Sequence, residues 1–390
     1  MINCLVLYAG YSVRASYYDD WLESFESHKA LSVIKINICD IFAKQKLQKI
    51  INKVDFVVLL HSVNSNHVFY LDQLCSVLAG RNCVLLSFVG NEVSLPGCYL
   101  SNKRSVLNKI LPDYIATQLP LEAGIHLWGD LVRESVLAVP HALNPNIFKS
   151  KTCNEMRPID IGVRAFKYPC HLGDNDRNNL LDFFKKHSFG LAVDISSDRF
   201  DRRGWVSFLN KCKGTVSSEA GSWFLSKDDS PIKDFEKKFD IQASCLFNAI
   251  FFRKLAHKFP WKIRSIITSY ILNQETNSSN NCEDDNEKFD FFLTQEKSLF
   301  YSKCISSRHF DAIGTRTAQI LLEGRYNDIL IPDEHYFSLH SDYSNIEEVI
   351  DNFKNDKLRI AITENAFSHV LEHHTYDKRI AQILKSIFKI

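Results

Sequence analysis

Residues 54–60 read Val-Asp-Phe-Val-Val-Leu-Leu, and this stretch decides the fold because all but one of its side chains are apolar. A strand that is apolar on nearly every residue has to be buried on both faces, which is typical of a parallel sheet covered by helices. Similar runs occupy residues 2–8, 31–38 and 82–88, and stretches with helical spacing lie between them. This alternation predicts right-handed βαβ units and a doubly wound α/β domain.

Two prolines mark the end of this first unit. Pro140 and Pro145 fall within six residues, which excludes a helix interior or a central strand and predicts a linker. The alternation of apolar runs and helical spacing restarts at about residue 159. We therefore expect two Rossmann-like domains, residues 1–145 and residues 146–375, that face each other across a cleft in which a ligand binds.

Two segments depart from the alternating pattern. An insertion of about residues 223–298 interrupts the second domain, and its aromatic, basic part at 242–272 fits either a helical pair packed on that domain or a surface that contacts a membrane. Residues 376–390 predict an amphipathic C-terminal helix, for which packing back on the N-terminal domain is one arrangement.

The bulk composition excludes several classes of protein. The 47 basic and 46 acidic residues nearly cancel, so no overall field favours nucleic acid as a partner. The 11 cysteines are scattered without a CxxC pair, as in a cytoplasmic protein with reduced thiols, and no cluster has the spacing of a metal site. The apolar start at residues 1–9 is too short for a secretory signal, and no apolar run is long enough to span a membrane.

Two segments carry polar groups that could bind a ligand. Glu92 follows the strand at 82–88, where ligand-contacting groups often lie, although a surface turn is equally consistent. Further on, Thr315 is expected to cap a helix over residues 316–322, with Arg316 and Gln319 on one face of its first turns. Such a helix start suits a nucleoside diphosphate, because the amides and Arg316 can bind phosphate oxygens and Gln319 can bind a ribose diol.

The neighbouring pair Arg308 and Asp311 has the same spacing as Arg316 and Gln319, and either pair could also be an ordinary solvated helix surface. The sequence around both pairs resembles the C-terminal half of bacterial group 1 glycosyltransferases, particularly the CgeB-like branch. Members of that family carry an Arg-x-x-Glu pair at a helix start, followed by three short motifs. The motif positions that match here are Pro332, His335, Tyr336, Ser344, Asn345, Glu348, His374, Thr375, Tyr376 and Arg379. Arg316 best matches the family spacing, with Gln319 in the place of the glutamate, whereas Arg308 and Asp311 form a competing register that keeps a carboxylate.

The resemblance implies a GT-B fold, with residues 1–145 on the acceptor side and residues 146–375 binding a nucleotide-sugar. It implies no bound metal, because arginine and a helix N-terminus would meet the charge of the leaving group, and no cofactor besides the nucleotide-sugar, which is the donor substrate. The positions that it assigns to the donor are Arg164, Gly221, Ser222, Arg308, Arg316 and Gln319. Glu219 is expected to act catalytically at the donor sugar, and His61 and His141 are candidate general bases, with a structural role as the alternative for each histidine.

The expected activity is transfer of a sugar to a glycan or lipid-linked acceptor in bacterial surface polysaccharide synthesis. The expected location is the cytoplasm, with peripheral contact at the inner face of the membrane as one variant. Two other functions fit the same fold. One is an epimerase-like enzyme that acts on a nucleotide-sugar without an acceptor, and the other is a non-catalytic protein that binds a nucleotide-sugar or a partner.

Overall fold

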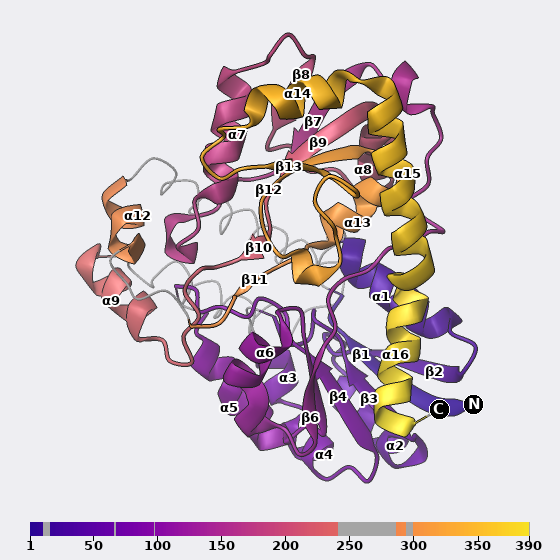
Figure 1. Cartoon of the computed structure of the whole chain (residues 1–390). Coiled ribbons are helices and arrows are strands. Elements are labelled where there is room, and N and C mark those ends of the chain that lie inside the picture. Colours follow the sequence, from indigo (N-terminus) through magenta and orange to yellow (C-terminus); the bar gives the residue numbers. More distant parts are fainter. Residues whose placement is uncertain (11–15, 66–67, 97, 241–285, 294–298, 390) are drawn as a thin grey trace.

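The computed structural model describes residues 1–390 except 11–15, 66–67, 97, 241–285, 294–298 and 390. Two parallel sheets form two lobes, one above the other in Figure 1. The expected α/β architecture with two Rossmann-like parts is therefore confirmed. The predicted membrane contact at residues 242–272 lies outside the described residues.

The N-terminal sheet has six parallel strands in the order β2-β1-β3-β4-β5-β6. Its strands are β1 Ile2–Tyr8, β2 Leu31–Asn37, β3 Phe56–Leu59, β4 Val84–Phe88, β5 Tyr114–Thr117 and β6 Ser135–Ala138. The helices between them are α1 Ser16–Ser27, α2 Ala43–Ile50, α3 Phe69–Asp72, α4 Cys75–Ala79, α5 Leu100–Ile110 and α6 Leu121–Trp128. All four residues of β3 are fully buried, as the apolar run at 54–60 predicts.

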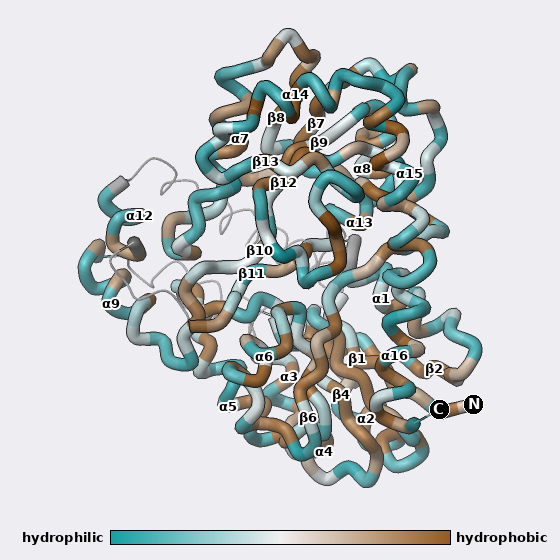
Figure 2. Tube along the Cα trace, in the orientation of Figure 1, coloured by the Kyte–Doolittle hydropathy of each residue, from teal (hydrophilic) through white to brown (hydrophobic). Residues whose placement is uncertain are grey.

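The C-terminal sheet has five parallel strands in the order β13-β12-β9-β7-β8. Its strands are β7 Ile159–Arg164, β8 Val193–Ser196, β9 Cys212–Ser217, β12 Ala318–Leu322 and β13 Phe337–Leu339. Its helices are α7 Asp176–Lys186, α8 Arg202–Leu209, α13 Ser307–Gly314, α14 Ile346–Lys354 and α15 Asp356–His373. In both lobes apolar segments run through the strands, and the outer helices alternate between polar and apolar residues (Figure 2).

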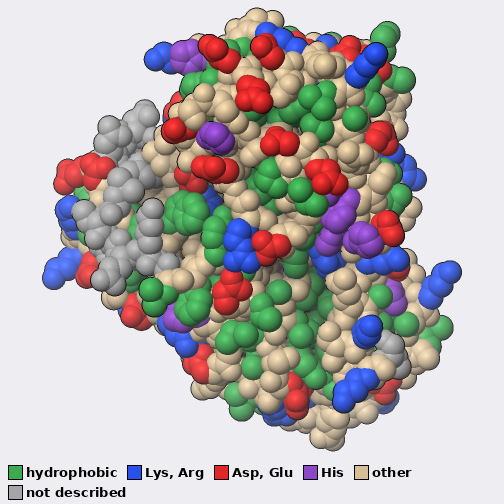
Figure 3. Space-filling view, viewed as in Figure 1, with side chains coloured by type: hydrophobic (Ala, Val, Ile, Leu, Met, Phe, Trp, Pro, Cys, Tyr) green, Lys and Arg blue, Asp and Glu red, His purple; other side chains and the backbone are tan. Residues whose placement is uncertain are grey.

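Two small elements lie between the sheets. β10 Ala220–Gly221 pairs antiparallel with β11 Lys303–Cys304. The described part of the insertion contains α9 Ser230–Lys238 and α12 Asn286–Leu293, which share a small aromatic core that includes Phe235 and Phe292. Acidic and basic side chains are interspersed over the face drawn in Figure 3, in keeping with the net charge of +1.

The predicted helix over residues 316–322 is wrong. The helix in this region is α13, which ends at Gly314, and residues 318–322 form β12. Thr315 is therefore the C-cap of α13 and not an N-cap, and Arg316 turns the chain with a φ of 53°. A short apolar run such as Ala-Gln-Ile-Leu-Leu does not distinguish a strand from a buried helix, and the sheet pairing of β12 with β9 and β13 decides between them.

The last helix, α16 Tyr376–Phe388, returns to the N-terminal lobe and packs beside α1 (Figure 1). Its buried residues Tyr376, Ile380, Ile383 and Leu384 join the core around Trp21. The N-terminal core is thus completed by the last residues of the chain.

We expect Ile380→Ala to lower the free energy of unfolding by about 2–5 kcal/mol, because a fully buried side chain leaves a cavity. Urea denaturation measures the change. Lys385→Ala, on the exposed side of the same helix, should stay within about 0.5 kcal/mol of wild type. A loss in Ile380→Ala as small as that in Lys385→Ala would mean that burial of this side chain against the N-terminal sheet contributes little.

Candidate functional site

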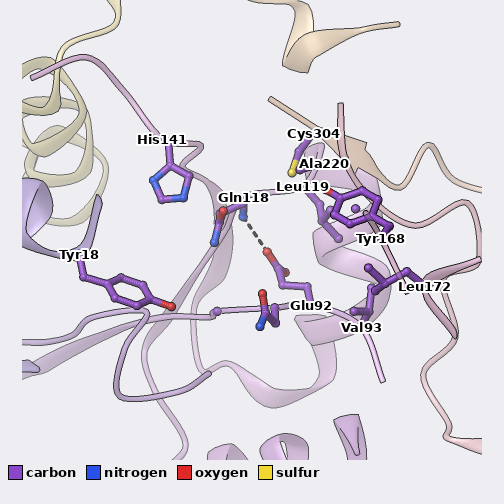
Figure 4. A pocket seen from close by; sticks show the side chains of 13 residues that line it. Tyr18, Glu92, Val93, Gln118, Leu119, His141, Tyr168, Leu172, Ala220 and Cys304 are labelled. Carbon is purple, nitrogen blue, oxygen red and sulfur yellow. Dashed lines mark hydrogen bonds between the residues drawn. The ribbon is translucent and has the colours of Figure 1, made fainter. Parts of the chain in front are cut away.

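A pocket of about 190 Å³ lies between the two lobes. The N-terminal lobe contributes loops that follow its strands, namely residues 90–93 after β4, Gln118 and Leu119 after β5, and His141 after β6, together with Tyr18 on α1. Tyr168, Leu172, Ala220, Gly221 and Cys304 line the opposite side. Figure 4 shows Tyr18 and His141 on one side, Tyr168 and Leu172 on the other, and Glu92 between them. The pocket therefore lies at the carboxyl ends of parallel strands, where α/β sheets bind ligands.

Glu92 is the only carboxylate among the described residues that line this pocket. Its Oε2 accepts hydrogen bonds from Thr117 Oγ1 and Trp128 Nε1, each at 2.7 Å, and its Oε1 accepts one from the Gln118 amide at 2.8 Å. Burial raises the pKa of Glu92, and these hydrogen bonds oppose the shift. The side chain is held firmly, and Oε1, with its single bond to the protein, can still accept a proton or a hydrogen bond.

Lys103 holds the backbone of the loop that carries Glu92. The ammonium donates to the Gly90 carbonyl at 2.8 Å and also to the Asn91 carbonyl. Burial lowers the pKa of Lys103 to about 8. A buried cation that binds only carbonyl oxygens fixes the backbone of the pocket loop.

His141 lies in the pocket wall and stacks on His61, with ring centroids 5.4 Å apart. His141 Nδ1 accepts from Trp21 Nε1 at 3.3 Å, and burial lowers its pKa to about 4, so the ring is neutral at pH 7. An indole N–H can only donate, which places the proton of His141 on Nε2. In this tautomer Nε2 carries a proton and is not suited to accepting one from a substrate.

His61, the other predicted base, is fully buried at the end of β3 and does not line the pocket. Neither of its ring nitrogens has a hydrogen-bond partner among the described residues. Burial, with a smaller contribution from His141, holds its pKa well below the usual value. The structure therefore places His61 behind His141.

A group of cations borders the pocket beside Tyr168. Arg177, on the first turn of α7, stacks on the Tyr168 ring at 3.7 Å, and Arg308 lies on the first turn of α13. The Arg308 side chain is exposed to solvent, although many protein atoms lie around it. Desolvation, then Arg177 and more weakly Arg199, lower its pKa to about 10. Neither Arg177 nor Arg308 forms an ion pair with a described carboxylate. An anion bound here would therefore relieve the repulsion among these arginines.

Arg164, which the sequence assigns to the phosphates, has an intramolecular partner. Its guanidinium pairs with Asp194 at 2.7 Å and stacks on Phe208 at 4.0 Å. Its carbonyl accepts a hydrogen bond from Arg308 at 3.1 Å. In this structure the Arg164 backbone orients Arg308, and its side chain is committed to Asp194.

Arg316 and Gln319 do not share a helix face as predicted. Arg316 bonds Glu364 on α15 at 3.0 Å and stacks on Phe367 at 3.4 Å. Gln319, on β12, is 2% exposed, and its amide nitrogen and oxygen both lack a partner among the described residues. Neither residue lines the pocket. The residues of the competing pair, Arg308 and Asp311, do lie on the first turns of one helix, α13.

We expect Gln319→Leu to raise the free energy of unfolding by about 1–2 kcal/mol, because it removes two buried polar atoms without partners. Nucleotide binding should not change. Urea denaturation and a nucleotide titration measure the two effects. Weaker nucleotide binding with unchanged stability would instead support the predicted contact between Gln319 and the ribose.

The three predicted residues around β10 occupy different environments. Gly221 lines the pocket with a φ of 112°, and an added Cβ would lie 2.7 Å from the Ser302 carbonyl oxygen. Ser222 is buried and accepts from the Phe224 amide. Glu219 is also buried, behind the pocket, where it accepts from the Tyr301 hydroxyl and from the Tyr326 amide at 2.7 Å. Burial raises the pKa of Glu219.

The sequence assigned no role to Tyr168 or Arg177, and it left Glu92 open between a ligand contact and a surface turn. The position of Glu92 after a buried strand was the signal that could have selected it, because ligands bind at strand ends. Arg177 and Arg308 are 131 residues apart in the sequence, and no local pattern joins them. Among the described residues, no group of three or more histidine, cysteine, aspartate or glutamate side chains could hold a metal ion. No described helix is both long and apolar enough to cross a membrane.

Comparison with known proteins agrees with this architecture. Residues 286–385 match a family described as glycosyl transferase-like, while no curated protein matches the chain. Among solved structures, Anabaena HepE in complex with UDP and glucose superposes with a TM-score of 0.52 at 8% identity over all of both chains. Sucrose-phosphate synthase from Thermosynechococcus elongatus superposes with a TM-score of 0.52 at 9% identity, again over all of both chains. The chain therefore has the GT-B fold of glycosyltransferases, and its residues 286–385 carry a glycosyl transferase-like sequence.

Proposed function

We propose that this protein is a glycosyltransferase that moves a sugar from a nucleotide-sugar donor to a glycan or lipid-linked acceptor. The observation that carries the proposal is a pocket at the strand ends of one lobe, bordered on the other side by arginines without a carboxylate partner among the described residues. A solved structure with the same fold, Anabaena HepE, is described in complex with UDP-glucose.

In this proposal the diphosphate of the donor binds Arg177 and Arg308 beside the N-terminus of α13. The arginines and the helix start supply positive charge where the leaving diphosphate gains negative charge. The sugar would extend past Tyr168 into the pocket, which Gly221 and His141 also line. Ser222 would contribute through the backbone next to Gly221, and Arg164 through its contact with Arg308.

We assign the general base to Glu92, because it is the pocket carboxylate and lies on the acceptor side. Glu219 keeps a proposed role in turnover, through the chain segment at Tyr326 that it holds behind the pocket.

We further propose a place in bacterial surface polysaccharide synthesis, in the CgeB-like branch that the motifs at residues 332–379 resemble. The nine described cysteines are all free thiols, which supports a cytoplasmic location. Contact with the inner face of the membrane through residues 242–272 remains part of this proposal.

The test is release of nucleoside diphosphate from a panel of sugar nucleotides, each with and without a mixture of glycan and lipid-linked acceptors. Release that requires an acceptor, together with a labelled sugar on that acceptor, would support transfer. Turnover of the donor alone would favour the epimerase-like enzyme. A rise in the thermal midpoint with a nucleotide but without any turnover would favour the non-catalytic binding protein.

A further inference from the structure

The first amide of helix α5 has an acceptor in the preceding loop, because Ser94 Oγ accepts from the Leu100 amide at 3.1 Å. Its N-cap residue, Tyr99, makes no side-chain hydrogen bond to the first turn. The first amides of a helix lack partners within the helix and need an acceptor. Asp229, more than a hundred residues later in the insertion, supplies a second acceptor. Its Oδ1 accepts from the Leu100 amide at 2.9 Å and lies 3.4 Å from the Ser101 amide.

Asp229 is committed to this contact. It is the N-cap residue of α9, yet its side chain forms no cap hydrogen bond with α9. The side chain is 1% exposed, and a buried carboxylate is costly unless hydrogen bonds compensate it. A second contact joins the same two helix ends, because the Tyr99 hydroxyl donates to Glu236 Oε2 at 2.7 Å.

The capped helix holds the loop of the candidate pocket. Ser94, directly after the pocket-lining residues 90–93, donates to Asp229 Oδ1 at 2.6 Å. Lys103, on the first turn of α5, donates to the Gly90 carbonyl at the other end of the same loop. Asp229 and α5 therefore hold both ends of the segment that carries Glu92.

We propose that Asp229 is a positioning residue that acts between the two lobes. When α9 packs on α5, Asp229 completes the cap of α5 and holds the loop at residues 90–94, which forms the acceptor-side wall of the pocket. When α9 leaves α5, the helix loses this acceptor and the loop at residues 90–94 loses an anchor. The insertion thereby couples its own docking to the geometry at Glu92. This inference rests on the proposed function only in taking the pocket as the site of reaction.

The cap is tested without any activity, by amide hydrogen exchange at Leu100 and Ser101 in the full chain. Asp229→Ala is expected to accelerate exchange at both amides by about tenfold, the size of effect that loss of a helix cap has on a local equilibrium. Asp229→Asn keeps an oxygen acceptor and should retain protection. Asp234→Ala, an exposed acid on the same helix, is the matched control and should exchange like wild type.

The positioning role is tested by kinetics with a competent donor and acceptor. Asp229→Ala should raise the KM for the acceptor about tenfold with donor affinity unchanged, and Asp229→Asn should restore most of it. Wild-type exchange rates in Asp229→Ala would overturn the cap, and faster exchange with an unchanged acceptor KM would overturn the positioning role. Absence of transfer in the wild-type protein would count against the proposed function, while the exchange experiment would still decide the cap.

Discussion

Arg308→Ala is expected to weaken binding of a nucleoside diphosphate by about 10- to 100-fold. A charge-assisted hydrogen bond contributes about 1.5–3 kcal/mol, and Arg308 is exposed and has no ion-pair partner among the described residues. Calorimetric titration of the purified protein with UDP and other nucleoside diphosphates measures the change. Arg308→Lys should recover only part of the affinity, because lysine keeps the charge but loses the planar fork.

Arg316→Ala is the matched control for this experiment. Arg316 pairs with Glu364 and stacks on Phe367, so its removal should leave nucleotide affinity unchanged. The partly exposed ion pair adds about 1 kcal/mol or less to stability. If Arg316→Ala abolished binding and Arg308→Ala did not, the register preferred on sequence grounds would be correct, and the arginines beside Tyr168 would be structural.

Glu92→Gln is expected to lower kcat by about 10²–10⁴, the usual contribution of a general base. Donor affinity should change little, because the arginines that we assign to the diphosphate belong to the other lobe. Glutamine can still accept from the Gln118 amide, but its NH2 group cannot accept from Trp128 Nε1. Some loss of stability is therefore expected as well, and the thermal midpoint has to be measured beside the rate.

The pH profile separates catalysis by Glu92 from a structural role. A general base has to be ionised, so kcat/KM should rise with pH through the pKa of Glu92, which burial raises above its usual value. In Glu92→Gln this rise of kcat/KM with pH should disappear. In Glu122→Gln, at the exposed surface of α6, the rise should remain. If Glu92→Gln were slower but kcat/KM still rose with pH in the same way, Glu92 would only support the loop.

The local properties of the chain were enough to predict the architecture. The run at residues 54–60 can be buried only between two layers of helices, and it became the fully buried strand β3. The amphipathic pattern at residues 376–390 predicted α16, because a helix with one apolar face is stabilised when that face is buried in a core. Both outcomes follow from composition and period, which are properties of neighbouring residues.

The site depended on contacts that no local pattern contains. Residues 318–322 have no preference strong enough to exclude a helix, and their pairing between β9 and β13 makes them a strand. Because residues 318–322 form a strand, the helix start in this region lies beside Arg308 and not at Arg316. Arg177 and Arg308 are likewise far apart in the sequence, and the order of the strands brings them together. Asp229 and Leu100 are also far apart, and the path of the insertion brings them together. Hydrophobic period determined the layers of this protein, whereas strand order, a property of the whole chain, determined which polar groups share a cleft.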